Sequence, residues 1–295
     1  MSARKTVVFV SEEKKALMAS WYERFQARLQ SPTPIESREV KTSFGNTHAL
    51  VTGPLDGPPL VILHGALASS AHLLPELGSL VNTRRVYAID VIGQSVRSED
   101  RRIPVDDDSY GRWVAEAATA LGLDTFDLFG VSWGGFVAMR AAQTIPDRVK
   151  HIVLVVPAGW VGNGIWASLR DAGFAMLAYR FFPSKARLEK ANATQFTTVD
   201  PFWQEYFGEA MLAYDLDMRI PPLVGPKEVA SLTMPVLVFA AEHDVSFPGA
   251  KLLARVKALL PHAETELFEG AKHSPAFTDE QRERVAKRVA GFLDR

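Results

Sequence analysis

The sequence contains no cysteine, and this absence removes several kinds of chemistry at once. A chain without thiols forms no disulfide bond, has no cysteine nucleophile and cannot bind zinc through cysteine. It also leaves the redox compartment of the protein open. The seven histidines form no cluster with carboxylates at metal-ligand spacing. We therefore expect a protein that holds no metal and no cofactor.

Long apolar runs and a strong charge of one sign are also missing. No stretch approaches the roughly 20 apolar residues that a membrane span needs, and the apolar run at residues 6–10 is too short for a signal peptide. The formal net charge is −1 and there is no basic stripe, so nucleic-acid binding has no electrostatic support. We expect a cytoplasmic protein with no membrane span and no nucleic-acid partner.

The chain does contain enough apolar material for a large core, because 47% of its 295 residues are hydrophobic. Residues 1–34 are predicted to be an N-terminal helical extension. Its helix, over residues 11–30, carries apolar side chains on one face and charges of both signs on the other. This pattern favours a helix packed over the rest of the protein; a helix lying on a membrane surface is the less favoured alternative.

Beyond the extension, apolar strands alternate with helices. A hairpin is predicted from segments 36–41 and 47–52. Strands are then predicted at residues 60–63, 85–89, 126–129, 149–156, 235–240 and 264–268. Helices are predicted at residues 71–81, 109–121, from 133 onward, 249–260 and 279–293. Such alternation is typical of a parallel sheet covered on both faces. The sequence therefore predicts an α/β fold whose core comprises residues 35–157 and 233–295.

The alternation stops between residues 158 and 232, where large apolar side chains become dense. Trp160 and Trp166 are two of them. We predict that this stretch is a helical lid inserted into the core rather than a domain of its own. Most of its aromatic side chains must pack the lid on the sheet, and some are left to line a binding site.

Residues 130–135 read Gly-Val-Ser-Trp-Gly-Gly and lie between a predicted strand and a predicted helix. A turn this sharp crowds the backbone around Ser132, and glycines two positions before and after it relieve that crowding. The serine also falls at a helix N-terminus, where free N–H groups favour a developing negative charge. The pattern predicts that Ser132 is a nucleophile; a glycine-rich surface turn is the alternative.

A serine hydroxyl needs a base within hydrogen-bond reach, and the base needs an orienting partner. In doubly wound sheets, functional side chains gather beyond the carboxyl ends of the strands. Asp244 follows the strand at 235–240, and His273 follows the strand at 264–268. We therefore predict that Ser132, Asp244 and His273 are the catalytic residues, with His273 as the base and Asp244 as its orienting acid.

Other polar residues compete for these roles. Glu242 and His243 flank the predicted acid, and at least one of them is expected to be a surface or supporting residue. Asp90 also follows a strand, but it precedes the serine in the chain and is expected to structure its own loop. His64 is expected to be a buried structural histidine rather than an acid or base.

The oxyanion that forms when serine attacks an acyl carbon needs two preorganised N–H donors. One is expected from Trp133, the residue after the nucleophile. The other is expected from the loop after the strand at 60–63, where Gly65 permits a tight turn. Ala66 is the first choice for this donor, and Leu67 is the alternative.

With these residues in this order, the chain resembles the α/β-hydrolase superfamily over nearly all of its length beyond the extension. The resemblance is carried by His64-Gly65, by the Gly-x-Ser-x-Gly motif around Ser132, and by Asp244 followed by His273. Finer features, such as the long preceding helix, are similar to bacterial carboxylesterases. The resemblance implies an α/β-hydrolase fold, with a mostly parallel central sheet, helices on both faces and a helical lid.

Departures from the superfamily narrow the expected chemistry. A serine nucleophile disfavours the dehalogenase and epoxide-hydrolase reactions of this fold, which use aspartate. Trp133 is larger than the residue common after the nucleophile in many small esterases, and we expect its bulk to shape the acyl pocket. Leu67, Trp160 and Trp166 are the predicted substrate-binding residues.

The favoured function is hydrolysis of a carboxylic ester or lactone of a small, partly apolar molecule through an acyl-enzyme intermediate. Two other reactions on the same triad stay open, namely C–C bond hydrolysis and cofactor-free haloperoxidase-like perhydrolysis. From another class, a ligand-binding receptor of the same fold is the alternative. The expected partner is the small-molecule ester or lactone, and the oligomeric state is left open.

Overall fold

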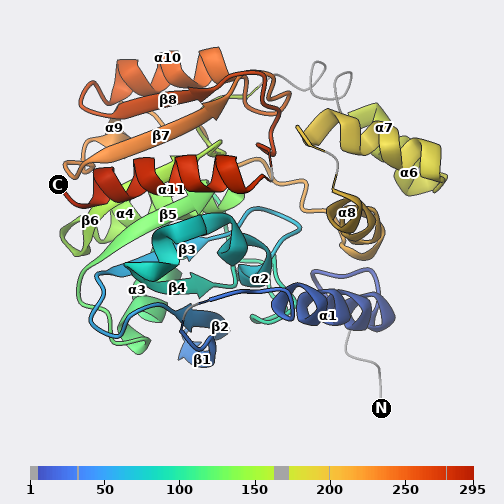
Figure 1. Ribbon diagram of the computed structural model, residues 1–295, viewed down its shortest axis with the longest axis horizontal. Coiled ribbons are helices and arrows are strands. Elements are labelled where there is room, and N and C mark those ends of the chain that lie inside the picture. Colours follow the sequence, from blue (N-terminus) through green and yellow to red (C-terminus); the bar gives the residue numbers. More distant parts are fainter. Residues whose placement is uncertain (1–5, 32, 163–172, 199, 277) are drawn as a thin grey trace.

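The computed structural model describes residues 6–31, 33–162, 173–198, 200–276 and 278–295. Its strands are β1 (Glu36–Thr42), β2 (Gly45–Thr52), β3 (Pro59–Leu63), β4 (Arg85–Ile89), β5 (Phe126–Val131), β6 (Val149–Val155), β7 (Val236–Ala241) and β8 (Glu264–Phe268). They form an eight-stranded sheet in the order β1-β2-β4-β3-β5-β6-β7-β8 (Figure 1). The pairings among β3 to β8 are parallel, whereas β2 is antiparallel to both of its neighbours. The predicted hairpin and the predicted parallel strands are confirmed.

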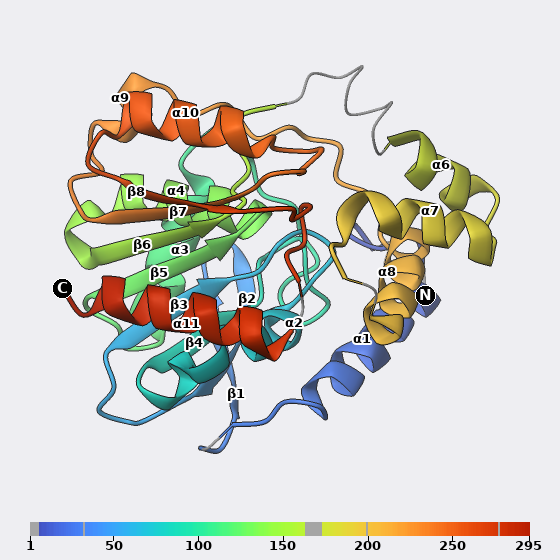
Figure 2. The same ribbon diagram turned by 45° about the horizontal axis from the view of Figure 1, so that its top comes forward.

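Both faces of this sheet are covered, as the apolar strands predict. Along β3, Val61 and Leu63 belong to one core layer, while Leu60 and Ile62 belong to the other. The first layer includes residues of α3 (Ser109–Ala120), α4 (Trp133–Thr144) and α10 (Gly249–Leu259). The second includes residues of α2 (Ser70–Leu73), the 3-10 helix η1 (Leu74–Asn82) and α11 (Asp279–Leu293). Figures 1 and 2 show α11 running across the sheet. The short helix η2 (Pro146–Arg148) lies directly before β6, and α9 (Pro226–Val229) lies before β7.

The helix predicted over residues 71–81 is wrong in one respect, because the chain forms α2 and then η1 there. Pro75 lies at the start of η1 and lacks the N–H that an α-helical bond needs. Gly78 has φ 52° and ψ −133°, which breaks the helical path. A Cβ at Gly78 would lie 3.2 Å from the backbone oxygen of Arg282 in α11. The break therefore lets η1 approach α11 closely.

Three helices that lie within the predicted lid form a cap beyond the carboxyl ends of the parallel strands (Figures 1 and 2). They are α6 (Phe174–Phe181), α7 (Lys185–Gln195) and α8 (Pro201–Ala213). The cap has a small apolar core of its own, made by Tyr179, Ala191 and Met211. In the part of the chain that the structure describes, no helix has the length and apolar content needed to cross a membrane.

The N-terminal helix α1 (Glu12–Gln26) packs against this cap. The ring centroids of Trp21 and Phe202 lie 5.3 Å apart, and those of Phe25 and Tyr206 lie 5.2 Å apart. Both contacts join α1 to α8. The apolar face predicted for the extension is therefore buried in a protein contact, since Trp21 and Phe25 are almost inaccessible to solvent.

Buried Asp90, which follows β4, joins α1 to the sheet. Its carboxylate accepts hydrogen bonds from the Tyr22 hydroxyl at 3.1 Å, from Nδ1 of His48 at 2.7 Å and from the Ser70 N–H at 2.9 Å. The Ser95 hydroxyl donates at 2.7 Å, which confirms the predicted loop-structuring role. Burial alone would raise the pKa of Asp90, but these hydrogen bonds and the electrostatic interaction with nearby histidines outweigh it and lower the pKa to about 2.

Candidate active site

Ser132 lies at the turn between β5 and α4, in a backbone conformation that side-chain-bearing residues rarely adopt. Its φ is 51° and its ψ is −114°. Its N–H donates to the Val155 carbonyl at 2.9 Å, and its own carbonyl accepts from the N–H groups of Gly135 at 2.9 Å and Ala158 at 3.0 Å. These backbone bonds to β6 and to the following loop hold the strained turn in place.

The two glycines of the motif are required by close backbone contacts. A Cβ at Gly134 would lie 2.0 Å from the carbonyl oxygen of Leu63, and a Cβ at Gly130 would lie 2.4 Å from the carbonyl oxygen of Gly134. Both distances are far too short for real atoms. Glycine at these positions therefore lets the start of α4 pack directly on β3 and β5, which sets the position of Ser132.

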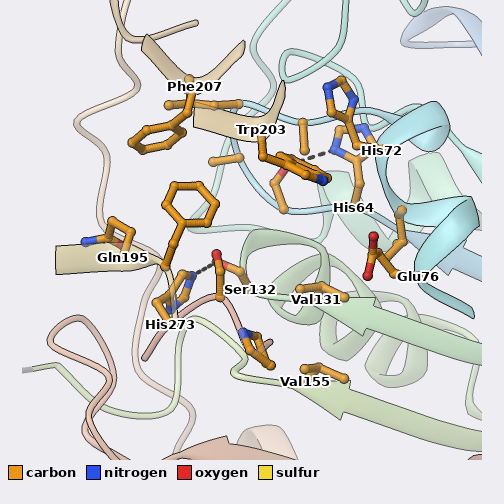
Figure 3. Close-up of a pocket in the computed structure, with 18 of the residues that line it drawn as sticks. His64, His72, Glu76, Val131, Ser132, Val155, Gln195, Trp203, Phe207 and His273 are labelled. Atoms are coloured by element: carbon orange, nitrogen blue, oxygen red, sulfur yellow. Dashed lines mark hydrogen bonds between the residues drawn. The ribbon is translucent and has the colours of Figure 1, made fainter. Parts of the chain in front are cut away.

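The three predicted catalytic side chains come together at this turn, and Figure 3 shows two of them, Ser132 and His273. Nε2 of His273 lies 3.0 Å from Oγ of Ser132, and Nδ1 lies 2.7 Å from Oδ2 of Asp244. The other carboxylate oxygen of Asp244 accepts the N–H groups of Ser246 at 2.7 Å and Phe247 at 3.0 Å. The carboxylate is thereby fixed and directs the Nδ1 proton of His273 towards itself. The Nε2 lone pair then faces the serine hydroxyl.

The electrostatics of the pair suit a general base. Burial raises the pKa of the Asp244 carboxyl, but the charge and hydrogen bond of His273 and two backbone N–H donors outweigh it, so the pKa is lowered. Burial lowers the pKa of His273, but the charge and hydrogen bond of Asp244 outweigh it and raise the pKa. The His273 side chain is 17% exposed, whereas that of Asp244 is inaccessible. A raised pKa makes His273 a better acceptor of the serine proton.

The loop after β3 lies against the nucleophile. A Cβ at Gly65 would lie 3.4 Å from Cβ of Ser132, in ordinary van der Waals contact, so the loop passes close to the nucleophile. Ala66 and Leu67 follow and line the cavity in front of the serine; Leu67 has a positive φ of 56°. Trp133 is the first residue of α4, where N–H groups have no intrahelical acceptor. The residues predicted to supply the oxyanion donors thus lie beside Ser132.

His64 is held as a structural residue, as the sequence predicted. Its Nδ1 donates to the Gly65 carbonyl at 2.7 Å, and its Nε2 accepts the Val91 N–H at 2.9 Å. Burial lowers its pKa. A neutral ring with both nitrogens engaged fixes the path of the loop that carries Ala66.

Glu242 and His243 support the loop that leads to the base. The Glu242 carboxylate accepts the Gly270 N–H at 2.8 Å, and the His243 N–H donates to the Ala271 carbonyl at 2.7 Å. Both bonds link the segment after β7 to the segment after β8. They therefore help to set the position of His273 relative to Asp244.

A cavity of about 320 Å³ opens in front of Ser132 and His273. Figure 3 shows Trp203 and Phe207 of the cap on one side of Ser132 and Val131 of the sheet on the other. The apolar side chains that line it are Leu67, Leu73, Phe129, Val131, Val155, Met176, Phe196, Trp203, Tyr206, Phe207, Phe268 and Val285. The cavity therefore suits a mostly apolar ligand whose reactive group lies at the serine.

Polar residues that the sequence did not reveal also line this cavity. They include Gln195 of α7 and the pair Glu76 and Arg282, in which Nε and Nη2 of Arg282 each lie 3.0 Å from a Glu76 oxygen. Figure 3 shows Glu76 and Gln195 on opposite sides of the cavity. They come from separate segments without a motif. Helical periodicity could have indicated that Arg282 faces inward, because it falls on the same helical face as the buried Val289.

Of the predicted substrate-binding residues that the structure describes, one lines the cavity and one packs in the core, and the side chain of Trp133 also packs in the core. Leu67 lines the cavity. Trp160 lies in the core layer of α3 and α4, away from the described lining of the cavity, and Trp166 lies outside the described residues. The indole of Trp133 packs in the same layer, with its ring centroid 5.7 Å from that of Phe136. The expected role of Trp133 as a wall of the acyl pocket is therefore wrong, since its side chain turns into the core beneath α4.

Comparisons with known proteins agree with the fold. The family model of the alpha/beta hydrolase fold matches residues 58–200. The chain is 26% identical to the uncharacterized carboxylesterase nap of Bacillus subtilis (strain 168), over 89% of this chain and 88% of that one. It is 28% identical to carboxylesterase YbfK of the same organism, over 88% and 89% of the two chains.

A solved structure gives the same likeness in three dimensions. The crystal structure of naproxen esterase (carboxylesterase NP) from Bacillus subtilis has a TM-score of 0.80 to this chain, with 25% sequence identity. The similarity covers 95% of this chain and 98% of that one. The predicted fold class, a mostly parallel sheet with helices on both faces, is therefore confirmed.

Proposed function

Because this chain is an α/β hydrolase of the carboxylesterase-like kind that acts on ester bonds, we propose that it forms an acyl-enzyme on Ser132. Its substrates are carboxylic esters or lactones of small, partly apolar molecules. The observation that carries the proposal is the hydrogen-bonded chain from Ser132 through His273 to Asp244, which opens on an apolar cavity. This arrangement supplies a nucleophile, a base and an orienting acid for acyl transfer.

In the first half of the reaction, Oγ of Ser132 attacks the ester carbonyl carbon. Nε2 of His273 takes the hydroxyl proton as the new C–O bond forms, and Asp244 stabilises the imidazolium. Collapse of the tetrahedral intermediate breaks the bond to the leaving oxygen, and His273 returns its proton to that oxygen. An alcohol leaves, or, for a lactone, the ring opens.

The negative charge of the tetrahedral intermediate resides on the former carbonyl oxygen. We assign its stabilisation to the backbone N–H groups of Ala66 and Trp133, with Leu67 as the alternative to Ala66. The start of α4 adds the favourable dipole of a helix N-terminus. The loop passes close to the nucleophile, since a Cβ built at Gly65 would lie 3.4 Å from Cβ of Ser132, and this nearness supports the role.

In the second half, water takes the place of the leaving alcohol. His273 removes a proton from this water as it attacks the acyl carbon, and then protonates Oγ of Ser132 when the acid is released. The net reaction adds one water across the ester bond. The cycle restores the neutral imidazole and the free hydroxyl.

The cavity indicates which esters fit. Aromatic and branched side chains dominate its lining, with Gln195 and the Glu76–Arg282 pair as polar groups at its margins. A related structure is that of a naproxen esterase, and naproxen is an aryl-substituted carboxylic acid. Esters of aryl-substituted or medium-chain acids are therefore the proposed substrates.

A fluorophosphonate probe tests the nucleophile. It should label the folded protein at Ser132, and Ser132→Ala should lose labelling and at least about 10⁴-fold in kcat. Ser274→Ala is the matched control, because Ser274 lines the same cavity beside His273. If wild type is not labelled and turns over no ester, a ligand-binding role replaces the enzymatic one.

A substrate panel tests the reaction class. It should contain acetyl, butyryl and octanoyl esters, an aryl-propionate ester, a lactone and a vinylogous diketone. The highest kcat/KM is expected for an aryl or medium-chain ester. Faster turnover of the diketone than of every ester and lactone would assign the triad to C–C bond hydrolysis instead.

A further inference from the structure

Helix α6 of the cap is apolar on two opposite faces. On its inner face, Met176 lines the cavity and Tyr179 is buried in the cap. On its outer face, Phe174, Leu177 and Phe181 are 63%, 40% and 69% exposed. The three outer residues recur at spacings of three and four, so they form one stripe along the helix. A helix that is apolar all round is normally buried in protein or lipid.

The exposed stripe continues into the segment after the helix. Phe182 is 67% exposed, and the Arg187 guanidinium lies 5.7 Å from its ring centroid. Isolated exposed apolar residues are common on protein surfaces, but several large ones gathered on one element mark an interaction site. Figures 1 and 2 show α6 and α7 at the outer end of the cap, away from the sheet.

The same region carries positive charge, although the whole chain has a net charge of −1. Residues 173–190 contain four basic side chains and one acidic side chain, Glu189. Arg180 turns inward and donates to the Tyr214 carbonyl at 3.2 Å. Lys185 and Lys190 are exposed and form no ion pair with another described residue. The exposed charge beside the aromatic stripe is therefore available to a partner.

We propose that this surface docks on an anionic lipid bilayer. It consists of Phe174, Leu177, Phe181 and Phe182 together with Lys185, Arg187 and Lys190, and is called the cap tip below. Phenylalanine and leucine next to lysine and arginine are the composition of helices that lie in a membrane interface, where the rings enter the acyl boundary and the cations meet anionic headgroups. The surplus of exposed cations distinguishes this occupant from an apolar protein groove.

Docking also has a consequence for the substrate, which rests on the function proposed above. Met176 lines the cavity from the inner face of the helix whose outer face forms the cap tip. A bilayer at the cap tip would therefore lie about one helix diameter, roughly 10 Å, from the cavity wall. The substrates favoured by this arrangement are lipophilic esters dissolved in the membrane.

Vesicle sedimentation tests the docking directly. Wild-type protein should bind vesicles of phosphatidylcholine and phosphatidylserine mixed at about 2:1, and should bind pure phosphatidylcholine far more weakly. Raising the salt to about 0.5 M should weaken the binding, because it shortens the Debye length to a few ångströms. Ser132→Ala should bind as wild type does, which separates docking from catalysis.

Two pairs of variants separate the apolar and the charged contributions. Lys185→Glu with Lys190→Glu should weaken binding to the mixed vesicles at least about 25-fold, since each lysine contributes about fivefold. Lys251→Glu with Lys257→Glu on α10 is the control, with the same charge change elsewhere on the surface. Phe174→Gln with Phe181→Gln should also lose binding, whereas Leu55→Gln, at a residue 83% exposed in the loop before β3, should not.

Three results would overturn the proposal. They are failure of wild type to bind the mixed vesicles, equal loss of binding in cap-tip and control variants, and a wild-type dimer that Phe174→Gln with Phe181→Gln converts to a monomer. The last result would make a second copy of this chain the occupant. Turnover of a short water-soluble ester should be unchanged in the cap-tip variants, so a failed docking test leaves the proposed ester hydrolysis standing.

Discussion

Glu76 of η1 and Arg282 of α11 form a bidentate ion pair at the wall of the catalytic cavity. Nε and Nη2 of Arg282 lie 3.0 Å from Oε2 and Oε1 of Glu76, and the two side chains are 19% and 23% exposed. Burial raises the pKa of Glu76 more than Arg282 lowers it, so the net shift is upward. The pair joins η1 to α11 where Gly78 lets the two elements approach closely.

Removing the cation should destabilise the protein. Arg282→Met leaves the Glu76 carboxylate without its partner, and we expect a loss of about 1–3 kcal/mol in the free energy of unfolding, less than for a fully buried pair. The loss should be larger near pH 8 than near pH 5, because an unpaired Glu76 with a raised pKa can take up a proton at the lower pH. Urea unfolding at both values measures this. The double variant Glu76→Gln with Arg282→Met should recover part of the loss, and a single variant as stable as wild type would contradict the prediction.

The pH dependence of turnover follows from the environment of His273. The base must be neutral to accept the proton of Ser132, and its pKa is raised above the usual 6.5 by Asp244. We expect kcat/KM to rise with pH through this raised value and then to level off. Asp244→Asn removes the charge that raises it, so the rise should move to lower pH while the maximum falls roughly 10³- to 10⁴-fold. Glu242→Gln, which leaves the pair intact, should keep the wild-type midpoint. An unchanged midpoint in Asp244→Asn would contradict the assignment.

The same pair predicts the opposite trend for stability. The pKa of His273 is raised in the folded protein, so its contribution is complete below about 6.5 and is lost as the pH rises through the raised value. The pKa of Asp244 is lowered, so its contribution is complete above about 3.8 and is lost as the pH falls through the lowered value. The stabilisation by the pair is therefore greatest between those limits, below the pH of full activity. The difference in Tm between wild type and Asp244→Asn, measured across this range, should be largest there and should shrink as the pH rises through the raised pKa of His273.

The glycine contacts around the nucleophile give a paired test of packing. Gly134→Ala would place a Cβ 2.0 Å from the Leu63 carbonyl oxygen, so the turn must shift and both folding yield and activity should fall sharply. Gly291→Ala on α11 meets nothing within 4 Å and should stabilise the protein by about 0.5–1 kcal/mol. The Tm values of Gly134→Ala and Gly291→Ala, measured by thermal unfolding, check these two predictions. A Gly134→Ala protein with wild-type activity would mean that the start of α4 does not set the position of Ser132.

The sheet and the triad could be predicted from the sequence because each depends on local patterns. Apolar runs mark the buried strands, and Ser132, Asp244 and His273 each follow the carboxyl end of one. Parallel strands bring such ends to one edge of the sheet, so their chain order and positions were enough. The break in the helix at 71–81 could not be predicted from local patterns. It is needed at Gly78 because η1 packs against α11, a helix about two hundred residues later in the chain.

The direction of the side chains at the start of α4 could not be predicted from local sequence patterns. A tryptophan next to the nucleophile has one amide and one indole, and the sequence does not say on which side of the turn each lies. Trp160 illustrates the same limit, since a buried aromatic in the lid can face the core or the cavity. Gln195, Glu76 and Arg282 reach the cavity from separate segments, so only the assembled fold brings them to Ser132.

The position of the Trp133 indole leads to a prediction about specificity. Trp133→Phe should lower the free energy of unfolding by about 1–3 kcal/mol, because it removes packed volume beside Phe136, and should leave acyl-chain preference unchanged. Phe207→Ala removes a ring from the cap side of the cavity and should raise the ratio of octanoyl to acetyl ester kcat/KM roughly tenfold. Assaying both variants on one ester series and unfolding both in urea distinguishes an effect on core packing from an effect on the choice of acyl chain. If Trp133→Phe shifted the chain-length profile while Phe207→Ala did not, the acyl group would have to lie on the α4 side of the nucleophile, against the cavity assigned to it.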